Sequence, residues 1–173
     1  MNNKNAKLIV LFPGKFYAAS SHLLFYAYAK YLDMGYEIIN VEYGNYSDMD
    51  EIKNHVLSKV EKIDFSVYDE IVFLSKSMGT VIAGWLAERL GNIIRHIYLT
   101  PLEATLQYIK NDKNVSMVIS GTADSYLEAD KLAEYCIQEK IKLELFECAD
   151  HSLSIPGDVY ASIDVLKQVV ELY

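Results

Sequence analysis

Cysteine and proline are scarce in this chain of 173 residues, which contains two cysteines and three prolines. Cys136 and Cys148 form neither a CxxC motif nor a histidine-rich metal-binding pattern, which argues against a disulfide scaffold and a zinc site. We predict that both are buried free thiols, Cys136 on a helix and Cys148 on a strand. Free thiols are typical of a reducing compartment, so the expected location is cytoplasmic.

Clusters of lysine and arginine are also missing, and the formal net charge is −8. Proteins that bind nucleic acid or anionic membranes usually concentrate positive charge on one face, so we expect neither partner. No apolar run approaches the roughly 18 residues that a membrane-spanning helix needs. The first residues, MNNKNAKLIV, contain no long apolar core of a secretory signal.

Glycine-rich phosphate loops are absent, since neither GxGxxG nor GxxxxGKS/T occurs and the stretch Phe12–Lys15 has a single glycine. This argues against a nucleotide- or flavin-binding domain. Repeats and linkers rich in proline, glycine or serine are absent too, so we expect one domain over residues 1–173. A domain of this length is stable without metals or disulfides. We expect no metal and no organic cofactor.

Short apolar segments alternate with amphipathic segments along the whole chain. The predicted strands are Lys7–Phe12, Glu37–Glu42, Glu70–Leu74, His96–Thr100, Val115–Ser120 and Lys142–Glu147. The predicted helices are Ser21–Met34, Asp48–Lys62, Thr80–Leu90, Leu102–Lys110, Tyr126–Lys140 and Asp158–Leu172. Apolar stripes that include Ile137 and Ile163 should face the core. The alternation predicts a mostly parallel sheet with helices on both faces, which binds ligands at the carboxyl ends of its strands.

The sequence FLSKSMGT, residues 73–80, lies at one such strand end. Its Ser-x-Ser-x-Gly spacing is close to the nucleophile elbow G-x-S-x-G, where small residues flank a serine held on a sharp turn. Gly79 takes the second small position, and Ser75 stands where glycine is usual. Ser77 is therefore the candidate nucleophile, with Ser75 packing at the strand end. The alternative is an ordinary small-residue turn before a helix.

A serine nucleophile needs a general base, and His151 is the best placed of the four histidines. It follows the last predicted strand, so it should lie at the same sheet edge as Ser77. The other histidines lie in helix or strand patterns and are expected to be structural or surface residues: His22, His55 and His96.

The base needs an acid that orients it, and Asp124 follows the fifth predicted strand. The chain order Ser77, Asp124, His151 is the order found in α/β-hydrolases. Asp124 could instead cap the next helix. Asp150 and Glu147 are rival acids, although Asp150 adjoins His151 and side chains of sequence neighbours rarely meet well.

An oxyanion hole needs backbone N–H groups directed at the developing negative charge. Met78 follows the candidate nucleophile and should supply one N–H. The second should come from the loop after the first strand, where Pro13 and Gly14 force a turn. Either Lys15 or Phe16 could donate it.

Together these segments resemble the α/β-hydrolase superfamily, and the resemblance extends from Lys7 to Tyr173. LIVLFPG is similar to its strand and oxyanion loop, with Pro13 in place of the usual histidine, and FLSKSMG is similar to its elbow. ISGTAD and ECADHSL are similar to the acid and histidine loops of small dienelactone-hydrolase-like and esterase-like enzymes. The resemblance implies a three-layer sandwich and a catalytic triad of Ser77, Asp124 and His151.

Two departures from the family pattern shape the expected fold. The first two strands of the family are missing here, which leaves six strands in the implied order 2-1-3-4-5-6. The segment Pro101–Asn114, where larger relatives insert a cap domain, is short. We therefore expect a minimal fold with no cap domain and an open site.

The resemblance implies a serine hydrolase that acts on a small-molecule acyl substrate, with carboxylesterase activity as the first hypothesis. A thioesterase or peptidase would use the same triad, and a non-catalytic binding module on this fold is the alternative class. Tyr17, Tyr43 and Tyr126 could form an aromatic rim for substrate, or could simply pack between loops. Lys15 and Lys76 could attract an anionic substrate, unless Lys76 points to solvent. The sequence does not indicate the oligomeric state.

Overall fold

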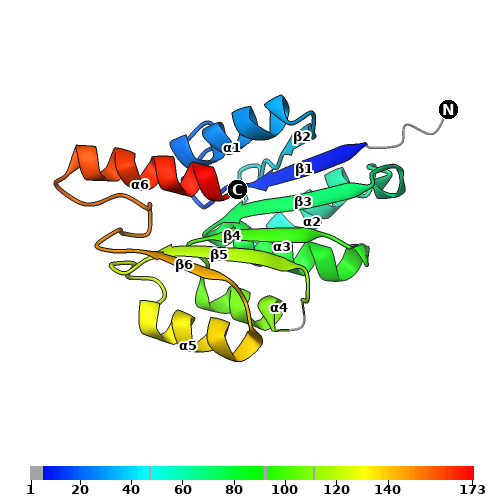
Figure 1. Ribbon diagram of the computed structural model, residues 1–173. Helices are drawn as coiled ribbons and strands as arrows, with labels where there is room; N and C mark the ends of the chain where they lie inside the picture. The colour runs from blue at the N-terminus through cyan, green and yellow to red at the C-terminus, as the bar shows by residue number, and fades with distance from the viewer. Residues whose placement is uncertain (1–5, 47, 92, 111) are drawn as a thin grey trace.

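A six-stranded parallel sheet forms the centre of the computed structural model, which describes residues 6–46, 48–91, 93–110 and 112–173 (Figure 1). Its strands are β1 (Lys7–Phe12), β2 (Glu37–Asn40), β3 (Glu70–Lys76), β4 (Arg95–Leu99), β5 (Val115–Gly121) and β6 (Leu143–Phe146). They lie in the order β2-β1-β3-β4-β5-β6, and every neighbouring pair is parallel. The predicted strand order is confirmed.

Among the described residues, six α-helices cover the two faces of this sheet. They are α1 (His22–Asp33), α2 (Met49–Val60), α3 (Met78–Leu90), α4 (Leu106–Ile109), α5 (Ala129–Glu139) and α6 (Val159–Leu172). The α1 and α6 helices pack on one face, and the other four pack on the opposite face (Figure 1). The predicted three-layer sandwich is therefore confirmed.

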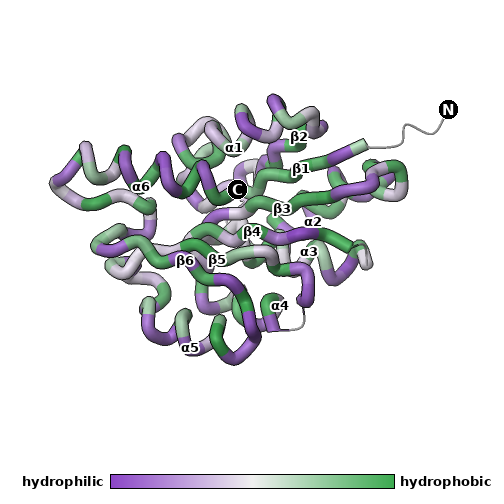
Figure 2. Tube along the Cα trace, viewed as in Figure 1, coloured by the Kyte–Doolittle hydropathy of each residue, from purple (hydrophilic) through white to green (hydrophobic). Residues whose placement is uncertain are grey.

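The central strands are buried on both faces because their residues are apolar at successive positions (Figure 2). In β1, Ile9 and Leu11 join the core beneath α1 and α6, while Leu8 and Val10 join the core beneath α2 and α3. This is the pattern expected of a parallel sheet with helices on both sides. The edge strands β2 and β6 are less buried.

The helix predicted over residues 102–110 is largely replaced by a 3₁₀ turn, Glu103–Thr105, followed by the short α4. Within the described residues of this connection, which omit residue 111, there is no cap domain, as predicted. In the same described part of the chain, no helix is both long and apolar enough to cross a membrane. Residues 1–5 lie outside the described residues. They belong to the N-terminal stretch in which the sequence predicts no secretory signal.

Three predictions of burial were wrong. Cys136 is buried, but Cys148 is exposed, because β6 ends at Phe146 and Cys148 falls in the following turn with a φ of 58°. Ile137 is exposed because it lies about 100° around α5 from the buried Cys136. Ile163 is exposed because it lies nearly opposite the buried Val165 on α6.

Gly79, in the first turn of α3, allows this helix to begin against the end of β1. A Cβ atom at this position would lie 2.4 Å from the carbonyl oxygen of Phe12 and 2.5 Å from that of Pro13. Both neighbours are backbone atoms, so neither can move as a flexible side chain would. The contact also brings the loop after β1 beside Ser77.

We predict that Gly79→Ala destabilises the protein by about 2–4 kcal/mol, because helix and strand must separate to accept the methyl group. Urea unfolding at neutral pH measures the change in the free energy of unfolding. The control is Gly91→Ala, where the space is open and only the positive φ of 63° opposes a side chain, so the cost should be about 1 kcal/mol. Equal losses in the two variants would contradict the prediction.

Candidate active site

Ser77 forms a sharp turn between β3 and α3. Its φ of 53° and ψ of −122° are neither helical nor extended, a conformation that costs free energy in a residue with a side chain. Hydrogen bonds hold the turn: the Ser77 N–H donates to the Leu99 carbonyl at 3.0 Å, and the Thr80 hydroxyl donates to the Ser77 carbonyl at 2.6 Å. Ser75, the second serine of the motif, is fully buried in β3.

His151 and Asp124 complete a chain of side-chain contacts with Ser77. The Nε2 atom of His151 lies 2.8 Å from Oγ of Ser77. The Nδ1 atom of His151 lies 2.8 Å and 3.0 Å from the two carboxylate oxygens of Asp124. The three residues follow β3, β5 and β6, whose carboxyl ends meet at one edge of the sheet. The structure thus brings together the three residues predicted as a triad.

Asp124 is buried but well supplied with hydrogen-bond donors. Besides His151, it accepts the backbone N–H of Tyr126 at 2.9 Å and the hydroxyl of Ser120 at 3.4 Å. Burial raises the pKa of Asp124, but these hydrogen bonds and the attraction of His151 outweigh it, and the pKa is lowered overall. The group is therefore a carboxylate that can orient the imidazole and stabilise its protonated form.

Neither rival acid lies in this position. Asp150 accepts the backbone N–H groups of Ser152 and Ser154, so its carboxylate shapes the loop that carries His151. Glu147 is exposed, beside Cys148.

The expected oxyanion donors lie close to Ser77. A Cβ atom on Gly14 would be only 3.1 Å from that of Ser77, so the loop after β1 runs directly beside the serine. The turn is closed by the Tyr17 N–H, which donates to the Gly14 carbonyl, and Phe16 has a φ of 60°. In the described part of the chain, neither Lys15 nor Phe16 donates its backbone N–H to another backbone group.

A cleft of about 910 Å³ opens over Ser77 and His151. The three tyrosines proposed for substrate all line it, but two of their hydroxyls have backbone partners. Tyr43 donates to the Pro13 carbonyl at 2.7 Å, and Tyr17 accepts the Leu23 N–H at 3.1 Å. Tyr126 is 65% exposed, and the centre of its ring is 4.3 Å from that of His151.

Comparison with solved structures supports the same architecture. An α/β serine hydrolase homologue from Coxiella burnetii matches with a TM-score of 0.69 and 14% identity, over 97% of this chain and 85% of that one. The chain has the α/β-hydrolase fold. The protein Est1E from Butyrivibrio proteoclasticus matches with a TM-score of 0.74 and 14% identity, over 98% of this chain and 88% of that one. A Pyrococcus furiosus esterase matches with a TM-score of 0.73 and 15% identity, over 99% of this chain and 83% of that one. No protein-family model and no curated protein matches the sequence.

The sequence left open whether Lys76 points to solvent. In this α/β-hydrolase fold it does not. Its side chain is almost fully buried, and Nζ donates to the Thr100 hydroxyl and to the His151 backbone carbonyl. Neither contact was predicted from the sequence. A signal was available, because Lys76 directly continues a strand in which each preceding residue from Ile71 onward is apolar or small.

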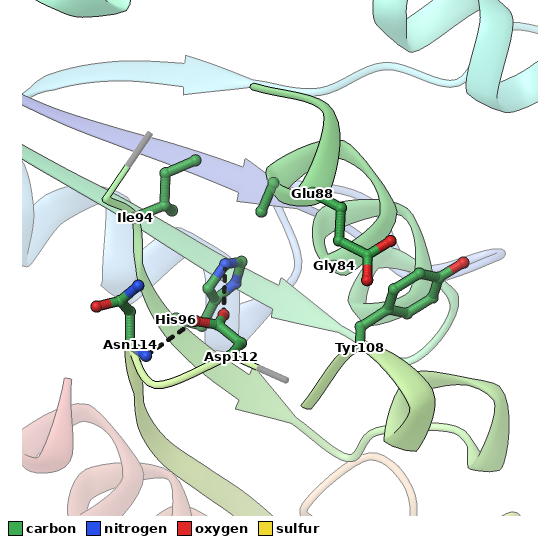
Figure 3. A pocket seen from close by; sticks show the side chains of 8 residues that line it. Gly84, Glu88, Ile94, His96, Tyr108, Asp112 and Asn114 are labelled. Carbon is green, nitrogen blue, oxygen red and sulfur yellow. Dashed lines mark hydrogen bonds and ion pairs between the residues drawn. The ribbon is translucent and has the colours of Figure 1, made fainter. Parts of the chain in front are cut away.

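A second cavity, of about 150 Å³, lies at the opposite end of β4, away from the Ser77 cleft (Figure 3). His96 is buried there, with Nε2 3.3 Å from a carboxylate oxygen of Asp112, and its ring stacks on that of Tyr98. Burial lowers the pKa of His96, and the attraction of Asp112 opposes this only in part. The imidazole is therefore neutral in the folded protein near pH 6.

His96 should make the protein less stable as the pH falls below about 6.5, the ordinary pKa of histidine. In that range the unfolded chain binds a proton that the folded chain resists, so the free energy of unfolding rises with pH. We predict that His96→Phe flattens this slope by up to about 1.4 kcal/mol per pH unit.

Urea unfolding between pH 5 and pH 8 measures the slope for the wild type and the variant. His55→Gln is the control, since it also removes one histidine but lies on α2. An unchanged slope in His96→Phe would show that the prediction is wrong.

Proposed function

We propose that this chain is a serine hydrolase that cleaves a carboxylic ester through Ser77, His151 and Asp124. The observation that carries the proposal is the continuous set of contacts from Oγ of Ser77 through both ring nitrogens of His151 to the buried Asp124 carboxylate. A serine with only a structural role in a turn does not require a histidine nitrogen 2.8 Å from its Oγ and a carboxylate bound to the other ring nitrogen.

In the proposed reaction, Ser77 Oγ attacks the substrate carbonyl carbon while His151 Nε2 takes the hydroxyl proton. Asp124 stabilises the imidazolium that forms. The backbone N–H of Met78 and that of Lys15 or Phe16 stabilise the oxyanion. His151 then gives its proton to the leaving alcohol, and an acyl-enzyme remains. Water attacks this ester with His151 again as base, which frees the acid and restores Ser77.

The cleft supports a substrate with an apolar or aromatic part. Exposed rings of Phe16 and Tyr126 stand at its mouth, and Tyr17 and Tyr43 line it with ring atoms while their hydroxyls hold backbone groups. Est1E, one of the similar structures, was solved with ferulic acid bound, an aromatic carboxylic acid. Because a Pyrococcus furiosus esterase is also among the similar structures, we favour esters over thioesters and peptides, which the same triad could also cleave.

One test of this proposal concerns the nucleophile. A fluorophosphonate probe should add once to the wild-type protein, and peptide mapping by mass spectrometry should place the adduct on Ser77. Ser77→Ala should not react, whereas Ser75→Ala should still react if it folds, because Ser75 is buried away from the cleft. A folded wild-type protein that stays unlabelled would favour a non-catalytic binding module.

Another test concerns the acid. Asp124→Asn should lower the rate of p-nitrophenyl ester hydrolysis on the order of a thousandfold or more, because an amide favours the wrong tautomer of His151. Glu147→Gln is the control: this rival acid is exposed beside Cys148, so the rate should stay within about threefold. If the two variants lose activity equally, Asp124 does not have the proposed role. Comparing the rates at which the wild type hydrolyses ferulate esters and acyl-CoA thioesters then identifies the substrate class.

A further inference from the structure

Lys76 is the one lysine among the described residues that is almost completely buried, at 2% exposure. Lysine is rarely buried to this degree unless its charge has a partner. Its side chain alternates along β3 with that of Ser75, so it points to the face covered by α1 and α6. This places its ammonium group beneath the loop that carries His151.

The partners of the ammonium come from three separate segments. Nζ donates to the His151 backbone carbonyl at 2.9 Å and to the Thr100 hydroxyl at 3.1 Å. It also lies 4.8 Å from the centre of the Tyr17 ring, within range of a cation–π interaction. Both hydrogen-bond acceptors are uncharged, so none of these contacts forms an ion pair.

We propose that Lys76 is a positioning residue that holds His151 in place for catalysis through the carbonyl group of its backbone. This role rests on the proposed function, since it requires that Ser77 and His151 react together. Because Lys76 immediately precedes Ser77, its hydrogen bond ties the backbone of the base to the backbone beside the nucleophile.

Among the described residues, the other backbone contacts of the histidine loop do not tie it to β3. Asp150 bonds to N–H groups within the loop itself. The Cys148 N–H donates to the Thr122 hydroxyl, and the Ala149 carbonyl accepts the Ala123 N–H, which connect the loop to the segment after β5. Lys76 instead connects it to β3, the strand that leads into Ser77.

The charge of Lys76 is also sensitive to its surroundings. Burial lowers the pKa of Lys76, the attraction of Asp124 and Asp150 opposes this in part, and the resulting pKa is about 8. His22 on α1 and the ring of Tyr17 also face this region. The ammonium form therefore predominates below pH 8 and is lost above it. A neutral amine donates a weaker hydrogen bond than an ammonium group, so the link to His151 weakens as the pH rises.

The test measures the rate of fluorophosphonate labelling of Ser77 by intact-protein mass spectrometry between pH 6 and pH 10. For the wild type, we expect the rate to fall several-fold above pH 8. We call this fall in rate the alkaline step. At pH 7, Lys76→Met should react at least tenfold more slowly than the wild type, and its rate should show no alkaline step. The loss should lie in the maximal rate rather than in the probe concentration at half saturation, because the base is misplaced while the cleft is intact.

Thr100 provides a milder variant that keeps the lysine. Thr100→Val removes one acceptor of the ammonium, which favours the neutral amine, so the alkaline step should move to lower pH. Thr100→Ser keeps the hydroxyl and should retain the wild-type profile. Lys142→Met removes an exposed lysine that directly precedes β6 and should match the wild type. A melting temperature at each pH separates a loss of reactivity from unfolding.

The outcomes distinguish the two proposals. If the wild type is not labelled at any pH, the proposed hydrolase function fails. If the wild type is labelled but folded Lys76→Met reacts within twofold of it at every pH, the positioning role is wrong and the hydrolase proposal stands. If Lys76→Met does not fold, Thr100→Val decides: an unchanged pH profile in that variant overturns the role of Lys76.

Discussion

The backbone turn at Ser77 is the constraint on which the rest of the site depends. With a φ of 53°, Ser77 is held in a conformation that a free chain would avoid. The turn persists because β4 accepts its N–H, Thr80 binds its carbonyl, and Gly79 lets α3 begin against the end of β1. The same contacts that keep this strain in place also bring the loop of Gly14 beside the serine. The same packing of α3 against the end of β1 therefore positions both the turn at Ser77 and the expected oxyanion donors.

Much of the fold could be predicted because a parallel sheet leaves a plain pattern in the sequence. The apolar runs of β1 and β3 have no polar face, which indicates burial on both sides, and the short connections limit the order of the strands. Residues that follow parallel strands share one sheet edge, so Ser77, Asp124 and His151 could be grouped from their positions in the chain alone. Their order along the chain then matched a known pattern.

The errors arose where burial depends on a precise end or rotation of an element. Cys148 falls outside the core because β6 stops two residues earlier, at Phe146. Ile137 and Ile163 show that an apolar residue on an amphipathic helix can face solvent when the buried stripe is narrow. Lys76 shows the reverse, since a charged residue lies in the core where a carbonyl, a hydroxyl and an aromatic ring surround it. Such tertiary partners leave no periodic pattern in the sequence.

The hydrogen bond from Tyr43 to the Pro13 carbonyl has a further consequence for how such a site can change. The segment after β2 forms a wall of the cleft, and through this bond it also supports the loop expected to bind the oxyanion. A substitution that reshapes the wall at Tyr43 therefore also disturbs the groups that stabilise the transition state. Substrate selectivity and reaction rate are therefore coupled at this residue, so variants that accept new substrates without losing turnover have to arise elsewhere on the rim.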